Sequence, residues 1–527
     1  MTTELAAGEA MATTDGDGAP VEILVTAAEA YPAFERLVLG ARREITAGFR
    51  IFDMSTRLRS DEAQAVGRDW FDLLLHVVRR GVRLRLLLSD FDPVVGTELH
   101  GLTWRTMRQA AALAELAGPD ARIEAIASLH PARIGVLARL ALWPRVDRML
   151  REKAADLLHL ERPRRARFLQ GHPHLRRLLM VDEDRTGPRR WPLPPLAPVT
   201  HHQKVAAVDG EVLYVGGLDL NERRWDSPRH EQPAEETWHD VQAIVRDPAA
   251  ARALAVHLDE LEDVIHLRAA PSDLGGRILR TVSARRRRGP LALSPKERLS
   301  EINDAIIGGI RTAERLIYLE TQFLRSSRIA SELARAARRA PGLELVVILP
   351  ARPEDVAFLG ARREDARFGE FLQYMAVRRI RRAFRGRVFV GSPARPVTAQ
   401  TQGRDVFHGA PMIYVHSKVC TFDDRLAIVS SANLNGRSMH WDTEVGVPLR
   451  DPATVRHVRL RCMGAMLGGA IDPAPFAEPG GVGHWQRLAI ENARTRPEAR
   501  RGFMLPHLST PARRFGRKLA TVPEEMV

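Results

Sequence analysis

Two stretches of the chain repeat each other and decide the fold. The first, HHQKVAAVDGEVLYVGGLDLNERRWD, spans residues 201–226, and the second, VHSKVCTFDDRLAIVSSANLNGRSMHWD, spans residues 415–442. Both run His-x-Lys, four mostly apolar residues and Asp, then six residues, a pair of small residues, and Asp or Asn. The copies begin at His202 and His416, so the repeat unit is about two hundred residues. That length is typical of a domain and not of a solenoid repeat.

The segments before the two copies also correspond. Residues 31–53 and 301–323 each have the pattern of an amphipathic helix that runs into a strand. Each is followed by a helical stretch and an apolar strand, VRLRLLLSD at 82–90 and LELVVILP at 343–350. This alternation predicts an α/β fold with two similar domains, each a mixed β-sheet flanked by helices.

The domain boundaries are expected where the composition changes. SARRRRGPLALSPKER combines a charge run with prolines, which favours an exposed linker. The sequence after about residue 470 is rich in Pro, Gly and Arg, which indicates a loosely packed tail. We therefore expect a disordered tail over 1–20, a first domain over 21–280, a linker over 281–298, a second domain over 299–470 and a C-terminal extension over 471–527.

Residues 131–168 form an insertion in the first domain that mixes Leu, Ile and Trp with many arginines at helical spacing. One interpretation is an interfacial amphipathic segment that meets anionic lipid. The other is an ordinary helical insertion that packs on the domain and turns its arginines to water. Insertions of the second kind are more common, and the sequence leaves both interpretations open.

Composition limits the class of protein. The 527 residues carry a formal net charge of +14, which favours anionic partners: phospholipid headgroups, nucleic acid or phosphate esters. Only five of the 79 basic residues are lysines, so a general preference for Arg explains much of the charge. The two cysteines, Cys420 and Cys462, do not make a disulfide framework.

No signal peptide or transmembrane segment is expected. The N-terminal residues lack a charged region followed by an apolar run, and no stretch of about 18 uncharged apolar residues occurs. The expected location is the cytoplasm or the membrane periphery, and export by a route without a cleaved signal stays open.

Each motif copy is predicted to open a β-hairpin. Asp209-Gly210 is a strong turn signal between the apolar runs VAAV and VLYVGG. Because residues two apart on a strand share a face, His202 and Lys204 point the same way, and His416 and Lys418 do likewise. A His and a Lys at the end of a buried strand are held on a rigid scaffold.

Two His and two Lys together suit phosphodiester chemistry. The lysines supply fixed positive charge for the phosphate, and one neutral imidazole can attack phosphorus to form a phosphohistidine. A second, protonated imidazole can donate its proton to the departing oxygen. No metal or cofactor is required. Since each domain holds half of this set, we expect the domains to pack face to face about a pseudo-two-fold axis.

Acidic residues complete the expected site. A nucleophilic imidazole needs an acceptor on its other nitrogen, and a carboxylate follows each copy, Asp240 in TWHDVQAIV and Glu444 in DTEVGV. Asp209 and Asp423 complete the two motifs and are counted with them. Their place at the hairpin turns nevertheless predicts a structural role, not that of an acid or base.

The duplicated His-x-Lys-x4-Asp resembles the mark of the phospholipase D superfamily, and the chain is most similar to the eukaryotic-type phosphatidylcholine phospholipase D branch. YVGGLDLNERRWD, TWHDVQ, YLETQFL and SSANLNGRSMHWDTEVGV resemble segments of that branch. The resemblance covers roughly residues 21–470. Gly217 and Asp219 stand where many superfamily members carry Ser and Asn.

The resemblance implies a bilobal α/β fold and hydrolysis or transphosphatidylation of glycerophospholipids through a phosphohistidine. By analogy, His202 is the nucleophile and His416 the acid. Asp219, Gln322 and Asn433 lie in the matching segments and are expected to support the site. The implied partners are a phospholipid membrane surface, a phosphatidyl substrate and a water or alcohol acceptor. No nucleic acid is expected, and the chain is expected to be a monomer.

Three other functions compete with that of a phospholipase D. A cardiolipin synthase-like phosphatidyltransferase would use the same chemistry with an alcohol acceptor. A nuclease of the same superfamily is less expected, because small members of that kind typically carry one motif per chain. A catalytically dead binding protein is disfavoured by the intact His and Lys of both copies.

Overall fold

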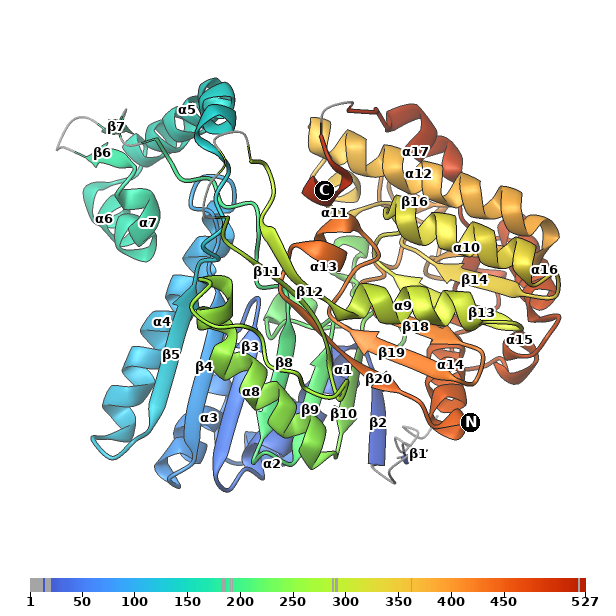
Figure 1. Ribbon diagram of the computed structural model, residues 1–527, viewed down its shortest axis with the longest axis horizontal. Coiled ribbons are helices and arrows are strands. Elements are labelled where there is room, and N and C mark those ends of the chain that lie inside the picture. The colour runs from blue at the N-terminus through green and yellow to red at the C-terminus, as the bar shows by residue number, and fades with distance from the viewer. Residues whose placement is uncertain are drawn as a thin grey trace.

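A computed structural model describes residues 13–14, 20–181, 186–189, 191, 193–286, 289, 292–361, 363–519 and 522–527. The tail expected over 1–20 lies outside the described residues except for 13–14 and 20. Two β-sheets dominate the described chain (Figure 1).

The first sheet has eight strands within the described residues, in the order β1-β2-β10-β9-β8-β3-β4-β5. These are β1 (Thr13–Thr14), β2 (Pro20–Val25), β3 (Glu44–Phe49), β4 (Arg83–Ser89), β5 (Ile123–Ser128), β8 (Lys204–Val208), β9 (Val212–Gly216) and β10 (Val241–Val245).

The second sheet has nine strands in the described part of the chain, in the order β12-β11-β20-β19-β18-β13-β14-β15-β21. These are β11 (Leu279–Ala284), β12 (Lys296–Ser300), β13 (Leu316–Thr321), β14 (Glu344–Ile348), β15 (Val388–Pro393), β18 (Lys418–Phe422), β19 (Leu426–Ser430), β20 (Glu444–Leu449) and β21 (Met504–Pro506). Two short hairpins lie outside the sheets: β6 (Leu179–Val181) with β7 (Thr186–Pro188), and β16 (Val406–Phe407) with β17 (Ala410–Pro411).

The two sheets have the same topology. The order β2-β10-β9-β8-β3-β4-β5 of the first sheet corresponds strand by strand to β11-β20-β19-β18-β13-β14-β15 of the second. In each, the three strands at one side pair in parallel and the remaining neighbours pair antiparallel. The structure therefore confirms the predicted α/β fold with two mixed sheets.

The helices divide into outer and inner layers. Outer helices cover the first sheet with α1 (Thr26–Leu39), α3 (Trp70–Arg79) and α4 (Thr97–Ala117), and the second with α9 (Glu301–Thr312), α10 (Ser327–Arg339) and α12 (Glu364–Phe384). Inner helices are α8 (Pro248–Ile265) and α14 (Pro452–Met466). Leu254 of α8 and Val458 of α14 share one apolar core with Val205 of the first sheet and Val419 of the second. This common core holds the two sheets together.

The expected linker is partly sheet. Residues 279–284 form β11, which is buried along its whole length and pairs with β20, and residues 296–300 form β12 beside it. The prediction of a linker over 281–298 is therefore wrong at both ends. The apolar and β-branched run ILRTVSA makes a good strand, and the arginines that follow it hid this pattern. Residues 287–288 and 290–291 lie outside the described residues.

The C-terminal extension is not loosely packed, which corrects the prediction from its composition. β21 pairs antiparallel with β15, and Trp485 on α16 (Gly481–Arg494) is fully buried in the shared core. A few large apolar side chains, spaced among Pro, Gly and Arg, are enough to anchor the segment. The other short helices are α2 (Asp61–Gln64), α11 (Glu354–Ala357), α13 (Gly436–His440), α15 (Ala474–Ala477) and α17 (Ser509–Phe515).

The insertion is helical, as predicted, but longer than 131–168. It contains α5 (Val136–Leu158), α6 (Arg162–Gly171), α7 (Pro173–Arg176) and the β6–β7 hairpin. It projects beyond the first sheet near α4 and β5 (Figure 1). No helix in the described ranges is both long and apolar enough to cross a bilayer.

Candidate active site

Both motifs lie at the centre of a sheet, and each opens a β-hairpin where the turn signals predict one. β8 pairs antiparallel with β9 and with β3, and β18 pairs in the same way with β19 and β13. Lys204 and Lys418 are the first residues of β8 and β18, and each catalytic candidate His precedes its Lys by two residues. Since these strands are buried along their length, the His and Lys are fixed by the sheet core.

Asp209 and Asp423 lie at the other end of these strands. Both adopt a positive φ, +56° and +50°, at the hairpin turns. Asp209 accepts hydrogen bonds from the amides of residues 42–44, and Asp423 from those of residues 314–316, all at 2.7–3.0 Å. A five-residue strand separates them from the lysines by roughly 16 Å. They tie the hairpins to the neighbouring strands, and they are not part of the site where the His and Lys meet.

The two imidazoles are held by carboxylates of the opposite half. His202 Nδ1 lies 3.0 and 3.1 Å from the two carboxylate oxygens of Glu444, at the start of β20. His416 Nδ1 lies 2.6 Å from Asp240 Oδ2, directly before β10. Asp240 and Glu444 are thus brought to the imidazoles as expected, but the pairing crosses between the domains.

The main chain repeats this crossed arrangement. The amide of His202 donates to Thr443 O at 2.8 Å, and the amide of His416 donates to His239 O at 2.7 Å. Isolated parallel bridges join His201 to Thr443 and His239 to Val415. The backbone before each motif is therefore fastened to the segment that carries the partner carboxylate, which sets the position of each imidazole.

Both lysines are almost wholly buried and lie against their own histidines. Lys204 Nζ donates to His202 O at 2.5 Å and lies 3.9 Å from Asp219 Oδ1. Lys418 Nζ lies 2.9 Å from His416 Nδ1 and also donates to His416 O. Two ammonium groups thus stand beside the imidazoles in a dry environment, where a fixed charge acts more strongly than in water.

Burial controls the protonation of the imidazoles. Burial lowers the pKa of His202 and of His416 well below the usual value, and nearby positive charges lower both further. Some of these charges come from the other half: Lys418 acts on His202, and both Lys204 and His202 act on His416. The two motifs therefore share one electrostatic site, in which both rings are neutral at pH 7 when no anion is bound.

The ammonium and carboxyl groups are shifted towards neutral pH as well. Burial lowers the pKa of Lys204 to about 8 and that of Lys418 to about 7. Burial also raises the pKa of Asp240 to about 6 and that of Glu444 to about 8, against the opposing effect of the lysines. Shifts of this kind, from desolvation together with a specific charge partner, are typical of catalytic sites.

A family profile described as "Cardiolipin synthase, PLD-like domain" matches residues 306–461, which include the second motif. Phospholipase D alpha 1 of Carica papaya is 24% identical over 48% of this chain and 46% of its own length. Phospholipase D1 of Mus musculus is 26% identical over 34% of this chain and 20% of its own length. The chain belongs to the phospholipase D superfamily. It spans less than half the length of these relatives.

Among solved structures, a phosphatidylserine synthase of Haemophilus influenzae superposes with a TM-score of 0.46 at 14% identity, covering 83% of this chain and 85% of that one. The architecture of the present superfamily member is established by its own two sheets.

The supporting residues of this phospholipase D superfamily member take different places. Asp219 accepts from the Ile51 amide at 3.1 Å and lies 3.5 Å from Arg50, so it bridges Lys204 to a second cation. Asn433 is buried, and its Oδ1 has no partner among the described residues. Gln322 donates a hydrogen bond to the Tyr414 hydroxyl at 2.6 Å. Among the described residues, it makes no hydrogen bond to either imidazole.

Three further residues of the superfamily site were not predicted. Ser431 Oγ donates to Glu444 at 2.5 Å, and its carbonyl lies 3.1 Å from His202 Nδ1. The Trp238 ring lies 4.6 Å from the His416 ring, and the Arg224 guanidinium stacks 3.6 Å above Trp238. Arg224 and Trp238 both stand in segments that carry the resemblance, and that position was the available signal. Ser431 acts partly through its carbonyl, which leaves no mark in a sequence.

Proposed function

We propose that the chain is a phospholipase D that hydrolyses the distal phosphodiester bond of glycerophospholipids, giving phosphatidic acid and a free headgroup. The observation that carries this proposal is the crossed pairing of His202 with Glu444 and of His416 with Asp240, beside two buried lysines. This arrangement offers a nucleophile, a proton donor and fixed positive charge to a single phosphate.

In the first step, His202 Nε2 attacks phosphorus. Glu444 holds the Nδ1 proton of His202, which leaves the lone pair on Nε2 free for the attack. The bond between phosphorus and the headgroup oxygen breaks, and that oxygen takes the proton of His416. Lys204 and Lys418 stabilise the negative charge that builds on the phosphate oxygens.

To act as an acid, the imidazole of His416 must be protonated, and both its burial and the positive charges around it oppose this protonation. In the absence of an anion, burial and the lysine charges keep the pKa of His416 well below its usual value. A phosphodiester brings a negative charge into the site and raises this pKa, as does the Asp240 carboxylate at 2.6 Å. Substrate binding and protonation of His416 are therefore coupled.

In the second step, His416 acts as a base. It takes a proton from water, whose oxygen attacks phosphorus; the phosphorus–nitrogen bond breaks and His202 leaves as a neutral imidazole. A primary alcohol in place of water gives transphosphatidylation by the same transfer of atoms. No step in this sequence needs a metal ion, because the lysines and the imidazolium supply the positive charge.

The second candidate is a phosphatidyltransferase of the cardiolipin synthase kind, favoured by the description of the profile that matches residues 306–461. It differs only in the acceptor, a lipid alcohol instead of water. A phosphodiesterase or nuclease of the same superfamily is a weaker candidate. For either lipid enzyme we propose a chain that acts as a monomer at the membrane periphery.

The test uses purified protein, vesicles of defined phospholipids and EDTA, with and without a primary alcohol. We expect headgroup release and phosphatidic acid in EDTA, and a phosphatidyl alcohol when the alcohol is present. Conversion of phosphatidylglycerol to cardiolipin without net hydrolysis would favour the second candidate. Cleavage of DNA with no turnover of any phospholipid would contradict both, and His416→Ala is the control for a contaminating lipase.

A further inference from the structure

The N-terminal half of α5 presents apolar side chains to solvent. Val136, Leu137 and Leu140 are 42%, 48% and 50% exposed. Their spacing places them on one face of the helix. Met180 and Trp191, farther along the same insertion, are also exposed.

The C-terminal half of α5 anchors this face by packing. In the C-terminal half of α5, Val146, Leu150 and Leu157 are buried in a small core that the insertion shares with Val94 of the first domain. The anchored half fixes the direction of the helix, so the apolar half is displayed to solvent by a packed element.

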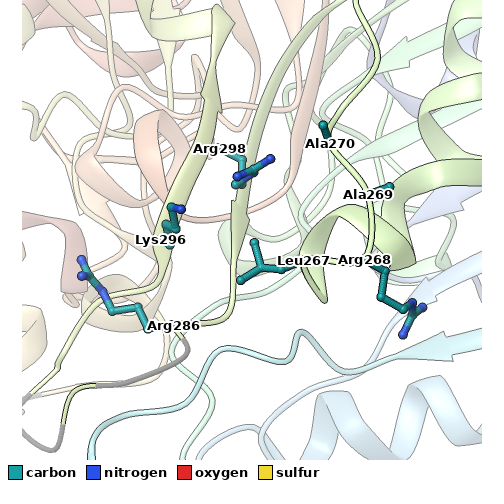
Figure 2. Close-up of a pocket in the computed structure, with 7 residues that line it drawn as sticks. All are labelled: Leu267, Arg268, Ala269, Ala270, Arg286, Lys296 and Arg298. Carbon is teal, nitrogen blue, oxygen red and sulfur yellow. The ribbon is translucent and has the colours of Figure 1, made fainter.

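The surroundings of this face are strongly basic. Residues 131–168 contain ten Lys and Arg against four Asp and Glu. A pocket of about 590 Å³ has four cationic side chains and no acidic one in its lining, which consists of Leu267, Arg268, Ala269, Ala270, Arg286, Lys296 and Arg298. Figure 2 shows Lys296 and Arg298 on β12, with Arg286 across the hairpin.

The basic pocket and the apolar face are joined through the β11–β12 hairpin. The Gly135 amide, directly before α5, donates to Ala292 O at 2.7 Å. Leu293 packs against the core of the insertion, and Lys296 follows three residues later. The hairpin that carries three of the four cations therefore contacts the start of the apolar helix half.

The start of the insertion also lies beside the active site. Ala132 and Val199 pack with Trp441, three residues before Glu444. The chain then runs from Val199 into His202, whose amide is bound by Thr443. The base of the insertion, four residues before the apolar face begins, is thus next to the segment that positions both the nucleophile and its carboxylate.

We propose that the apolar face of α5 (Val136, Leu137 and Leu140), together with the basic pocket, is the surface that docks the protein on a bilayer rich in anionic phospholipid. Apolar side chains surrounded by cations match the acyl–headgroup boundary of such a bilayer. A second copy of this chain would bring the same positive charge and is disfavoured. The purpose of the docking, delivery of substrate to His202, rests on the proposed phospholipase D function; the docking itself does not.

The binding test uses the full chain with His202→Ala, so that the lipid is not consumed. Flotation with vesicles of phosphatidylglycerol and phosphatidylcholine is compared with pure phosphatidylcholine vesicles. We expect strong binding only to the anionic vesicles, and a loss of at least about tenfold with Leu137→Glu/Leu140→Glu. Lys296→Glu/Arg298→Glu is expected to weaken binding to the anionic vesicles and to leave the pure phosphatidylcholine sample unchanged.

The matched control is Leu116→Glu. Leu116 is 53% exposed on α4. It lies about 22 Å along the helix axis from Gly101, where α4 meets His172 of the insertion. We expect it to bind vesicles like the parent. Equal binding by Leu137→Glu/Leu140→Glu and Leu116→Glu, with equal melting temperatures, would overturn the proposal. So would sedimentation that shows a parent dimer dissociated by Leu137→Glu/Leu140→Glu, because the occupant would then be a second copy.

A rate measurement separates this proposal from the proposed function. With His202 intact, Leu137→Glu/Leu140→Glu is expected to lose at least tenfold in rate on anionic vesicles and to retain its rate on a short-chain phospholipid below its critical micelle concentration. A parent protein that floats with vesicles but hydrolyses neither substrate would contradict the phospholipase D function and leave the docking surface supported. Equal rate losses on both substrates would contradict the docking role.

Discussion

The two motif hairpins have the same backbone plan but surround their histidines differently. His202 keeps 14% of its side chain exposed and faces both oxygens of Glu444, whereas His416 is 6% exposed and lies against the Trp238 ring. Both imidazoles must reach the substrate, one at phosphorus and the other at the leaving oxygen. The Trp238 ring orients His416 as a proton donor, whereas the more exposed ring of His202 is open for attack on phosphorus. The difference therefore supports His202 as nucleophile and His416 as acid, which the duplicated sequence alone did not distinguish.

The largest effects are expected from removing either imidazole. His202→Ala and His416→Ala should each reduce phospholipid turnover by at least about a thousandfold. An activated diester with a nitrophenolate leaving group needs no proton donor, so His416→Ala should recover much of its first-step rate on this substrate, and His202→Ala should not. Stopped-flow release of nitrophenolate measures both. Recovery by His202→Ala alone would reverse the two roles.

The crossed carboxylates are expected to give the next largest losses. Asp240→Asn should impair the same step as His416→Ala, and Glu444→Gln the same step as His202→Ala. Each should lower the rate of phospholipid turnover by roughly one hundredfold. The activated diester again separates the pairs: it should rescue Asp240→Asn and not Glu444→Gln. Rescue of the opposite variant would show that each carboxylate acts within its own half.

The lysines give a pH test. Lys418 and Lys204, with pKa values lowered by burial to about 7 and about 8, must be charged to hold the phosphate. In the free protein, loss of the Lys418 proton should make kcat/KM fall as the pH rises through about 7. Glu444, whose pKa is raised to about 8, must lose its proton to hold His202 and opposes this fall near pH 8. Lys418→Arg keeps its charge and should lose about a hundredfold in rate because a guanidinium fits the space poorly. The alkaline limb of its pH–rate profile should move up towards pH 8. An unmoved limb would remove Lys418 from this role.

The smallest effect on turnover is expected at the turns. Asp423→Ala leaves three buried or half-buried amides without an acceptor and should lower the free energy of unfolding by about 2–3 kcal/mol. Asp209→Ala should cost less, because Asp209 is more exposed. Urea unfolding measures this order. Initial rates at 20 °C should stay within about twofold of the parent in both, and a thousandfold loss would restore a chemical role.

The sequence predicted those parts of the molecule that depend on local pattern. The helix and strand at α1–β3 and again at α9–β13, the hairpins after Lys204 and Lys418, and the two carboxylates all follow from spacing and turn chemistry. It did not predict that Glu444 serves His202, because that depends on how the two sheets dock. It also missed β11 beside its arginine run, and the backbone contact of Ser431, for which no side-chain pattern exists.

The central claim is that one phosphate is handled by both halves of the chain and is carried by His202. Acid-quenched mixing of the protein with phospholipid, followed by mass spectrometry of the intact chain and of its peptides, tests this directly. We expect one phosphatidyl group per chain, on the peptide that contains His202, and we expect it to accumulate when His416→Asn slows the second step with an activated diester. A group found on His416, or two groups per chain, would contradict it.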